Sequence, residues 1–242
     1  MDAARLGRMR NPIIVALDLP TGRAALDLAT RLAPHVGAVK VGKELFTAAG
    51  PEVVRALRAA GLEVFLDLKF HDIPNTVAGA VRSAVALDVR MLTVHAGGGS
   101  AMLRAAESAA RTAAAERGTE PPLVLGVTVL TSMDADALRE VGVAAEPAAQ
   151  VQRLAALAVD AGLRGLVCSP QELSWLRRVL PAGVQLVTPG IRPANAAADD
   201  QKRVMTPEAA REQGADWLVI GRPITAAPDP VAAARAISQS LR

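Results

Sequence analysis

Aromatic side chains are almost missing from this 242-residue chain, which has three Phe, two Trp and no Tyr. Proteins that bind single-stranded nucleic acid stack bases on aromatic rings, so the sequence offers poor material for such a surface. The charge balance points the same way, because 27 Lys and Arg residues against 24 Asp and Glu give a net charge of only +3, scattered along the chain. We therefore expect no nucleic-acid partner and at most a general preference for anionic ligands.

The chain also has a single cysteine and no long apolar run. Cys168 cannot form a disulfide within the chain, and its apolar neighbours predict a buried structural thiol rather than a nucleophile. No apolar stretch approaches the roughly 20 residues that span a bilayer, and the first residues lack the apolar core of a secretory signal. We expect a cytoplasmic protein with no membrane partner.

Lysine is scarce beside many arginines, and only Lys40, Lys43, Lys69 and Lys202 occur. Lys40 and Lys69 lie where apolar, strand-like runs end. A chain that otherwise uses arginine and keeps lysine at such positions suggests a need there for a compact, titratable cation.

Short apolar runs alternate with helical patterns along the whole chain. The spacing between runs is about 22 to 35 residues, and this rhythm predicts a (β/α)8 TIM barrel, for which about 250 residues is typical. The predicted strands are residues 13–18, 37–42, 62–69, 89–95, 123–128, 165–169, 184–188 and 216–220. Helical patterns are expected over residues 26–32, 51–60, 77–81, 100–117 and 147–161, then from Gln171 and from Pro230, with Asp134 as a helix N-cap.

A barrel of this length accounts for the whole chain, so we expect one domain over residues 1–242 with residues 1–12 as an N-terminal extension. The structural alternative is a doubly wound open sheet. That fold usually carries a glycine fingerprint after its first strand, and Asp18-Leu19-Pro20-Thr21-Gly22 has none.

The stretch Asp67-Leu68-Lys69-Phe70-His71-Asp72-Ile73-Pro74-Asn75-Thr76 is the most informative part of the sequence. Asp67 and Lys69 are two apart at a strand end, so their side chains share a face. Asp72 lies on the following loop, where Pro74 suits the first turn of a helix, and its charge faces either this site or a neighbouring subunit. Taken alone, an Asp/Lys pair at a strand end is most simply a surface pair.

The barrel turns scattered polar residues into a ring, because active sites of barrels lie at the carboxyl ends of the strands. The chain has a polar residue at or just beyond most strand ends. His95, before Gly97-Gly98-Gly99, is either a packed structural histidine or an acid/base group. The predicted ring consists of Asp18, Lys40, Asp67, Lys69, His95, Thr131, Arg192 and Arg222.

The two sides of this ring predict different chemistry. The loops after strands seven and eight often bind phosphate in barrels, and here they supply Gly190, Arg192, Gln201, Gly221 and Arg222. The long polar loop of residues 190–203 is a candidate lid.

On the other side, positive and negative side chains alternate in the order Lys40, Asp67, Lys69 and Asp72. Two ammonium groups neutralise these carboxylates and fill the space that a hard cation needs, so we expect no metal. Such a network orients a lysine as a proton donor and suits a reaction that makes and protonates a carbanion.

These motifs resemble orotidine 5'-phosphate decarboxylases of the bacterial type. The D-x-K-x-x-D pattern with the following I-P-N-T is joined by A-L-D (16–18), V-K-V-G (39–42), V-H-A (94–96), L-T-S (130–132), P-G-I-R (189–192), D-Q-x-R (200–203) and I-G-R-P-I-T (220–225). The resemblance runs from about residue 13 to the last helix. It implies cofactor-free decarboxylation of orotidine 5'-monophosphate to uridine 5'-monophosphate in pyrimidine biosynthesis.

The resemblance also implies roles for the charged network. Lys69 matches the proton donor to C6 of the pyrimidine, and Asp67 matches the acid that faces the substrate carboxylate. Lys40 and Asp72 complete the network. Asp72 and Thr76 match the pair that a second subunit contributes, so the resemblance implies a homodimer with shared active sites.

The remaining site residues are also implied by the resemblance. Asp18 and Lys40 match contacts to the ribose hydroxyls, and Thr131 and Ser132 lie by the base. The phosphate grip corresponds to Arg192, Gln201, Gly221 and Arg222.

Two other functions remain open at this point. D-x-K-x-x-D also occurs in magnesium-dependent sugar-phosphate decarboxylases and aldolases of the same superfamily, which would need a metal ligand where Lys40 stands. A non-catalytic protein that binds nucleotide phosphates would keep the two arginines without needing Lys40 or Lys69.

Overall fold

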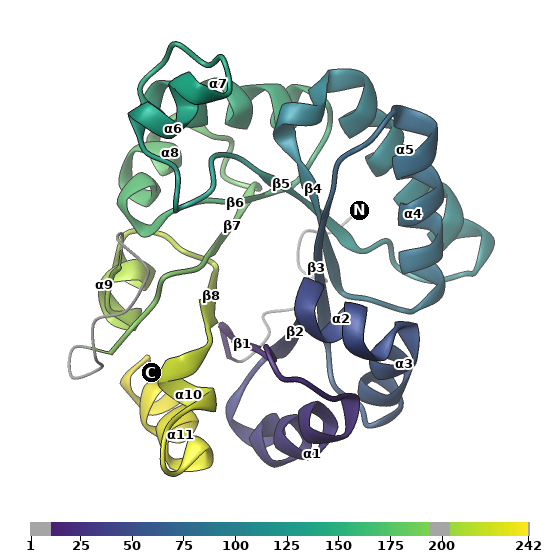
Figure 1. Cartoon of the computed structure of the whole chain (residues 1–242), viewed down its shortest axis with the longest axis vertical. Coiled ribbons are helices and arrows are strands. Elements are labelled where there is room, and N and C mark those ends of the chain that lie inside the picture. Colours follow the sequence, from purple (N-terminus) through teal and green to yellow (C-terminus); the bar gives the residue numbers. More distant parts are fainter. Residues whose placement is uncertain (1–10, 194–203, 242) are drawn as a thin grey trace.

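The computed structural model describes residues 11–193 and 204–241. Eight parallel strands pair in sequence order and close into a barrel, with β1 beside β8 (Figure 1). The predicted TIM barrel is therefore confirmed, and every predicted strand is present. The strands are β1 Ile13–Ala16, β2 Ala38–Gly42, β3 Val64–Phe70, β4 Met91–His95, β5 Leu123–Val127, β6 Gly165–Val167, β7 Gln185–Thr188 and β8 Trp217–Ile220.

Helices surround the barrel on its outer side (Figure 1). The α-helices are α1 Gly22–Leu32, α2 Lys43–Ala49, α3 Pro51–Ala59, α4 Pro74–Ala86, α5 Gly99–Glu116, α6 Ala135–Glu140, α7 Pro147–Asp160, α8 Leu173–Val179, α9 Pro207–Glu212, α10 Arg222–Thr225 and α11 Pro230–Ser240. Short 3-10 turns cover η2 Ala33–His35, η3 Ala96–Gly98 and η4 Pro170–Glu172. Pro74 opens α4 and Asp134 caps α6 through Ala137 N, as the sequence predicts. The short helices α2, α9 and α10 were not predicted, because each spans too few residues for a clear period.

Two apolar layers hold the barrel together. Along β1, Ile13 and Val15 face outward into the core between strands and helices, whereas Ile14 and Ala16 face the barrel interior. This alternation follows from the two-residue period of a strand. The interior is packed with side chains from several strands, including Phe65, and is not a channel.

The ordinary strand period breaks at one place, in β3. Leu66 pairs with Leu92 and Phe70 pairs with Val94, so the register shifts between them. Lys69 within this irregular segment has a left-handed backbone, with φ of 54°. A non-glycine residue with positive φ is uncommon and often marks a functional site.

The described part of the N-terminal segment and the single thiol are both held by the barrel. The side chain of Asn11 donates to His35 O at 2.6 Å and to Ser238 Oγ at 2.9 Å, so residue 11 is tied to the barrel. Residues 1–10 of the expected extension lie outside the described residues. Cys168 is buried, as predicted, and burial raises the pKa of its thiol. Within residues 11–193 and 204–241, no helix has the length and apolarity needed to cross a bilayer.

Arg177 on α8 ties together the ends of β7 and β8. Its guanidinium donates to Gly214 O at 2.8 Å, to Val184 O at 2.6 Å and to the Asp216 carboxylate. The same carboxylate accepts the Leu186 N–H at 2.7 Å. One side chain therefore pairs the polar groups at the ends of both strands.

We expect Arg177→Ala to lower the free energy of unfolding by about 2 kcal/mol, because the carbonyls and the carboxylate lose a charged donor. The neighbouring Arg178 is exposed, and Arg178→Ala should stay within about 0.5 kcal/mol of wild type. Urea unfolding of both variants measures the difference. Equal losses in the two variants would show that Arg177 does not hold the strands.

Candidate active site

A cavity of about 300 Å³ opens at the carboxyl ends of the strands. Most of the predicted ring lines it, from β1 round to the loop after β8. The predicted residues in its wall are Asp18, Lys40, Asp67, Lys69, Thr131, Gly190, Arg192, Gly221 and Arg222. We call this cavity the mouth pocket.

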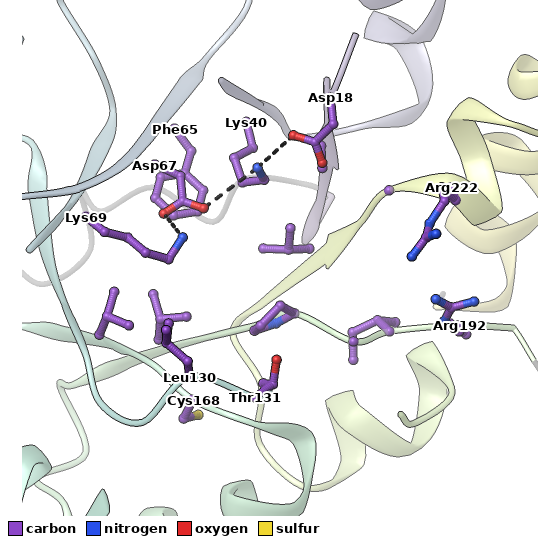
Figure 2. Close-up of a pocket in the computed structure, with 18 of the residues that line it drawn as sticks. Asp18, Lys40, Phe65, Asp67, Lys69, Leu130, Thr131, Cys168, Arg192 and Arg222 are labelled. Atoms are coloured by element: carbon purple, nitrogen blue, oxygen red, sulfur yellow. Dashed lines mark hydrogen bonds and ion pairs between the residues drawn. The ribbon is translucent and has the colours of Figure 1, made fainter. Parts of the chain in front are cut away.

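One side of the mouth pocket carries a series of alternating charges (Figure 2). Lys40 Nζ lies 3.3 Å from Asp18 Oδ1 and 3.7 Å from Asp67 Oδ2, and Lys69 Nζ donates to Asp67 Oδ1 at 2.8 Å. The ammonium of Lys40 thus lies between two carboxylates. The predicted Asp67–Lys69 pair forms. It is the irregular backbone at Lys69, and not a regular strand, that brings the two side chains together.

Asp67 is the buried centre of this series, with 12% of its side chain exposed. Burial alone would raise the pKa of the carboxyl group, because the charged form loses water. The charges of Lys40 and Lys69, with hydrogen bonds from Lys69 and Thr93, more than offset burial and lower the pKa of Asp67. The carboxylate is therefore ionised at neutral pH.

The absence of a side chain at Gly42 makes room for Lys40. A Cβ at Gly42 would lie 2.8 Å from Lys40 Nζ and 3.1 Å from Asp18 Oδ1. Any larger residue would therefore push the ammonium away from its two carboxylates. This role was not predicted, although Gly42 and Lys40 are two residues apart on β2 and therefore share a face. The ammonium lies over Gly42 because it pairs with Asp18 after β1 and with Asp67 on β3.

The opposite side of the pocket carries the two arginines (Figure 2). Arg222 opens α10 directly after Gly221, and Arg192 follows β7. The Arg192 N–H donates to Met205 O at 2.9 Å and Met205 N–H donates to Gly190 O at 3.2 Å, which closes the base of the loop. Gln201, and residues 194–203 of the expected lid, lie outside the described residues.

Apolar side chains also line the mouth pocket, and we call them the apolar floor. Phe65, Val127, Leu130 and Cys168 contribute to it, and Thr131 lies at its edge. Ser132 instead lines a neighbouring hollow of about 430 Å³, to which Thr131 also contributes. These apolar residues were not predicted as part of the site, because the sequence does not distinguish apolar strand residues that face the pocket from those that face the helices.

Asp72 and Thr76 behave differently from the rest of the network. Among the described residues that line the mouth pocket, neither is present. Both are exposed, at the tip where β3 leads into α4, and Ile73 between them is 67% exposed. They lie on the outer surface rather than in their own chain's pocket.

His95, which was expected in the ring as either a packed structural histidine or an acid/base group, is outside the described lining of the mouth pocket. Its ring is half-buried and packs against His71, with centroids 5.4 Å apart. Burial lowers the pKa of His95, and the nearby His71, Lys43 and Lys69 lower it further. The packed structural histidine is therefore the reading that agrees with this contact.

Thr93 on β4 is a polar contact of the site that the sequence analysis missed. Its side chain is fully buried and bonds to both Asp67 and Lys69. The available signal was a lone polar residue inside the apolar run Met91-Leu92-Thr93-Val94. Among the described residues, no group of three His, Cys, Asp or Glu side chains is arranged to hold a metal ion.

Comparisons with known proteins agree with this geometry. Residues 11–237 match the model of the orotidine 5'-phosphate decarboxylase / HUMPS family. Two curated relatives named orotidine 5'-phosphate decarboxylase, from Moorella thermoacetica and Opitutus terrae, are 55% and 56% identical over 233 and 230 residues. These alignments cover 96% and 95% of this chain and 92% and 98% of the relatives.

A crystal structure of orotidine 5'-phosphate decarboxylase from Lactobacillus acidophilus superposes with a TM-score of 0.85 at 41% identity. That match covers 96% of this chain and 99% of the other. The family match spans nearly the whole chain, and the curated relatives are identical at more than half of the aligned positions. The chain therefore belongs to the orotidine 5'-phosphate decarboxylase / HUMPS family.

Proposed function

We propose that this protein decarboxylates orotidine 5'-monophosphate to uridine 5'-monophosphate and CO2, in pyrimidine biosynthesis and without a cofactor. The observation that carries the proposal is the charge series Lys40–Asp67–Lys69, which faces two arginines across a pocket of about 300 Å³. A nucleoside monophosphate with a carboxylated base has an anionic group at each end. Family membership and the names of the relatives support the same reaction.

Lys69 is the proposed proton donor. When the bond from C6 to the carboxylate breaks, the electron pair stays on C6 in the plane of the ring, where no conjugated group takes it up. A fixed ammonium stabilises this charge as it develops and then transfers a proton to C6. The resulting neutral amine regains its proton from solvent. Asp67, at 2.8 Å from Lys69 Nζ, orients the ammonium and favours its charged form.

The substrate orientation follows from the same assignment. Asp67 faces the substrate carboxylate, while Asp18 and Lys40 contact the ribose hydroxyls. Thr131 and Ser132 lie beside the base. The phosphate binds Arg192, Gln201, Gly221 and Arg222, because guanidinium groups donate paired hydrogen bonds and glycine lets the backbone approach.

The proposal requires no metal ion. The Lys40 ammonium lies between Asp18 and Asp67, 3.3 Å and 3.7 Å from their carboxylates. A hard cation bound by these two carboxylates would have to take that position. The charge that a divalent ion would supply is therefore already supplied by a side chain.

We also propose a homodimer in which Asp72 and Thr76 complete the partner's site. Their exposed position beside Ile73, away from their own pocket, supports this arrangement. A two-fold interface places the same tip of each chain against the other pocket. Each site then has one more carboxylate beside Lys69 than the single chain provides.

The proposed function is tested by the ultraviolet absorbance of orotidine 5'-monophosphate mixed with chelator-treated protein. Orotate and uracil rings absorb differently, so turnover is seen directly. We expect a fast change that the chelator does not reduce, and no measurable change with Lys69→Ala, because the carbanion loses its ammonium and proton donor.

Lys43→Ala is the matched control, since Lys43 is exposed and lies outside the described pocket lining. It should keep wild-type turnover. Activity of wild type that requires magnesium would instead favour a sugar-phosphate enzyme of the same superfamily. Near-normal turnover by Lys69→Ala would remove this lysine from the acid role.

Arg222→Ala should reduce kcat/KM for orotidine 5'-monophosphate by about a hundredfold or more, while changing turnover of orotidine much less. Contacts to the phosphate, which does not react, supply binding energy that orients the reacting ring and closes the site. Orotidine lacks that phosphate and never uses the contact. Equal losses on both substrates, measured in the same absorbance assay, would contradict the assignment.

Subunit mixing tests the shared site. Lys69→Ala and Asp72→Ala homodimers should each be nearly inactive, because every site lacks one member of the network. Mixed under exchange conditions, they form heterodimers in which one of two sites is intact, so about a quarter of wild-type activity should return. A mixture that stays inactive although exchange is shown by mass spectrometry would mean that each site is built from one chain.

A further inference from the structure

Thr93 joins the two charged residues of β3 from the neighbouring strand. It lies on β4, and its side chain is fully buried. Its Oγ1 accepts the backbone N–H of Lys69 at 2.8 Å and donates to Asp67 Oδ1 at 3.0 Å. One hydroxyl therefore bonds the main chain of the lysine and the side chain of the aspartate at once.

The irregular pairing of β3 and β4 explains why a side chain is needed at this point. Leu66 and Phe70 pair with Leu92 and Val94, so four steps along β3 lie against two along β4. Thr93 is the residue between the two paired positions. Extra residues in a bulge leave the regular ladder, and their main-chain groups need other partners. The Thr93 hydroxyl serves as that partner for Lys69.

The same hydroxyl offsets the left-handed backbone of Lys69. A φ of 54° costs free energy for a non-glycine residue and persists only where surrounding contacts hold it. That conformation directs the lysine side chain back to Asp67, at 2.8 Å. The hydrogen bond to Thr93 is thus part of what fixes the lysine.

We propose that Thr93 is a positioning residue for the decarboxylation, whose hydroxyl holds the Lys69 backbone and the Asp67 carboxylate so that the Lys69 ammonium is aimed at C6. The inference rests on the proposed function. Thr93 is outside the described lining of the mouth pocket, so it acts through Asp67 and Lys69 and not by touching substrate.

Only a hydroxyl meets this need. Threonine and serine accept one hydrogen bond while donating another, whereas valine has the shape of threonine and does neither. Thr93→Val leaves a buried N–H without its acceptor and takes one donor from the Asp67 carboxylate. Thr93→Ser keeps both bonds and loses only a methyl group.

Removal of the Thr93 hydroxyl should shift the pH dependence of the rate in one direction. The charged groups around Asp67 are Lys40 on β2 and Lys69 on β3, with Asp18 beyond Lys40 and His95 on β4. The hydrogen bond from Thr93 favours the ionised carboxylate and lowers the pKa of Asp67. Removing it raises that pKa, so the acid limb of the pH–rate profile moves to higher pH.

The test compares Thr93→Val, Thr93→Ala and Thr93→Ser with wild type. We expect the valine and alanine variants to lose roughly ten- to hundredfold in kcat, with KM within about threefold and the acid limb about half a unit higher. The Thr93→Ser variant should stay within about threefold of wild type in kcat, and its acid limb should lie at the same pH as that of wild type. Titration of the substrate phosphate is common to all four proteins, so the difference between profiles comes from the enzyme.

Equal losses of kcat in Thr93→Ser and Thr93→Val would mean that Thr93 serves only packing, which would overturn the proposal. A wild-type kcat in Thr93→Val or Thr93→Ala would overturn it as well. A second readout does not depend on turnover. Carbon NMR of the Asp67 carboxyl group should give a higher pKa in Thr93→Val than in wild type, and an unchanged pKa would overturn the inference. If wild type does not turn over orotidine 5'-monophosphate, the proposed function fails while this titration still decides the role of Thr93.

Discussion

The buried carboxylate of Asp67 fixes the arrangement of the pocket around it. Burial disfavours its charge, and the protein offsets this with two ammonium groups and a hydroxyl from three adjacent strands. Breaking such a cluster on one side leaves an uncompensated charge, which costs far more than an exposed ion pair gives. The positions of Lys40, Lys69 and Thr93 are therefore set by one negative charge.

The barrel supplies the geometry that this charge requires. Parallel strands bring their carboxyl ends to the same mouth, so residues far apart in sequence become neighbours there. Asp18, Lys40 and Asp67 come from or follow three consecutive strands, and their separations fall to 3.3 Å and 3.7 Å. The closed sheet keeps these strands in register and limits how far the charges can relax.

The division of the pocket into two charged sides with an apolar floor has a chemical consequence. An apolar surface such as that of Phe65 and Val127 lowers the local dielectric and strengthens each charge that faces the ligand. In the proposed reaction, an anion held by the arginines on one side places the ring against the lysine on the other. The proposed phosphate contacts and the proposed proton transfer therefore come from different strands of the barrel.

The order of the strands and the closed barrel were predictable from the sequence, because strand period and spacing are local properties of the chain. The Asp67–Lys69 pair was also predicted, although an irregular backbone at Lys69, and not the regular strand period assumed, brings the two side chains together. Lys40, Arg192 and Arg222, which lie at or just beyond strand ends, were correctly expected to face one pocket. For His95 the sequence left two readings open, and the packed structural one agrees with its contact with His71. The short helices α2, α9 and α10 were not predicted. The contacts of Lys40 with Asp18 and Asp67, and those of Thr93 with both members of the Asp67–Lys69 pair, became visible only in the folded barrel. These contacts depend on the register between neighbouring strands and on a bulge, and neither is set by any single stretch of sequence.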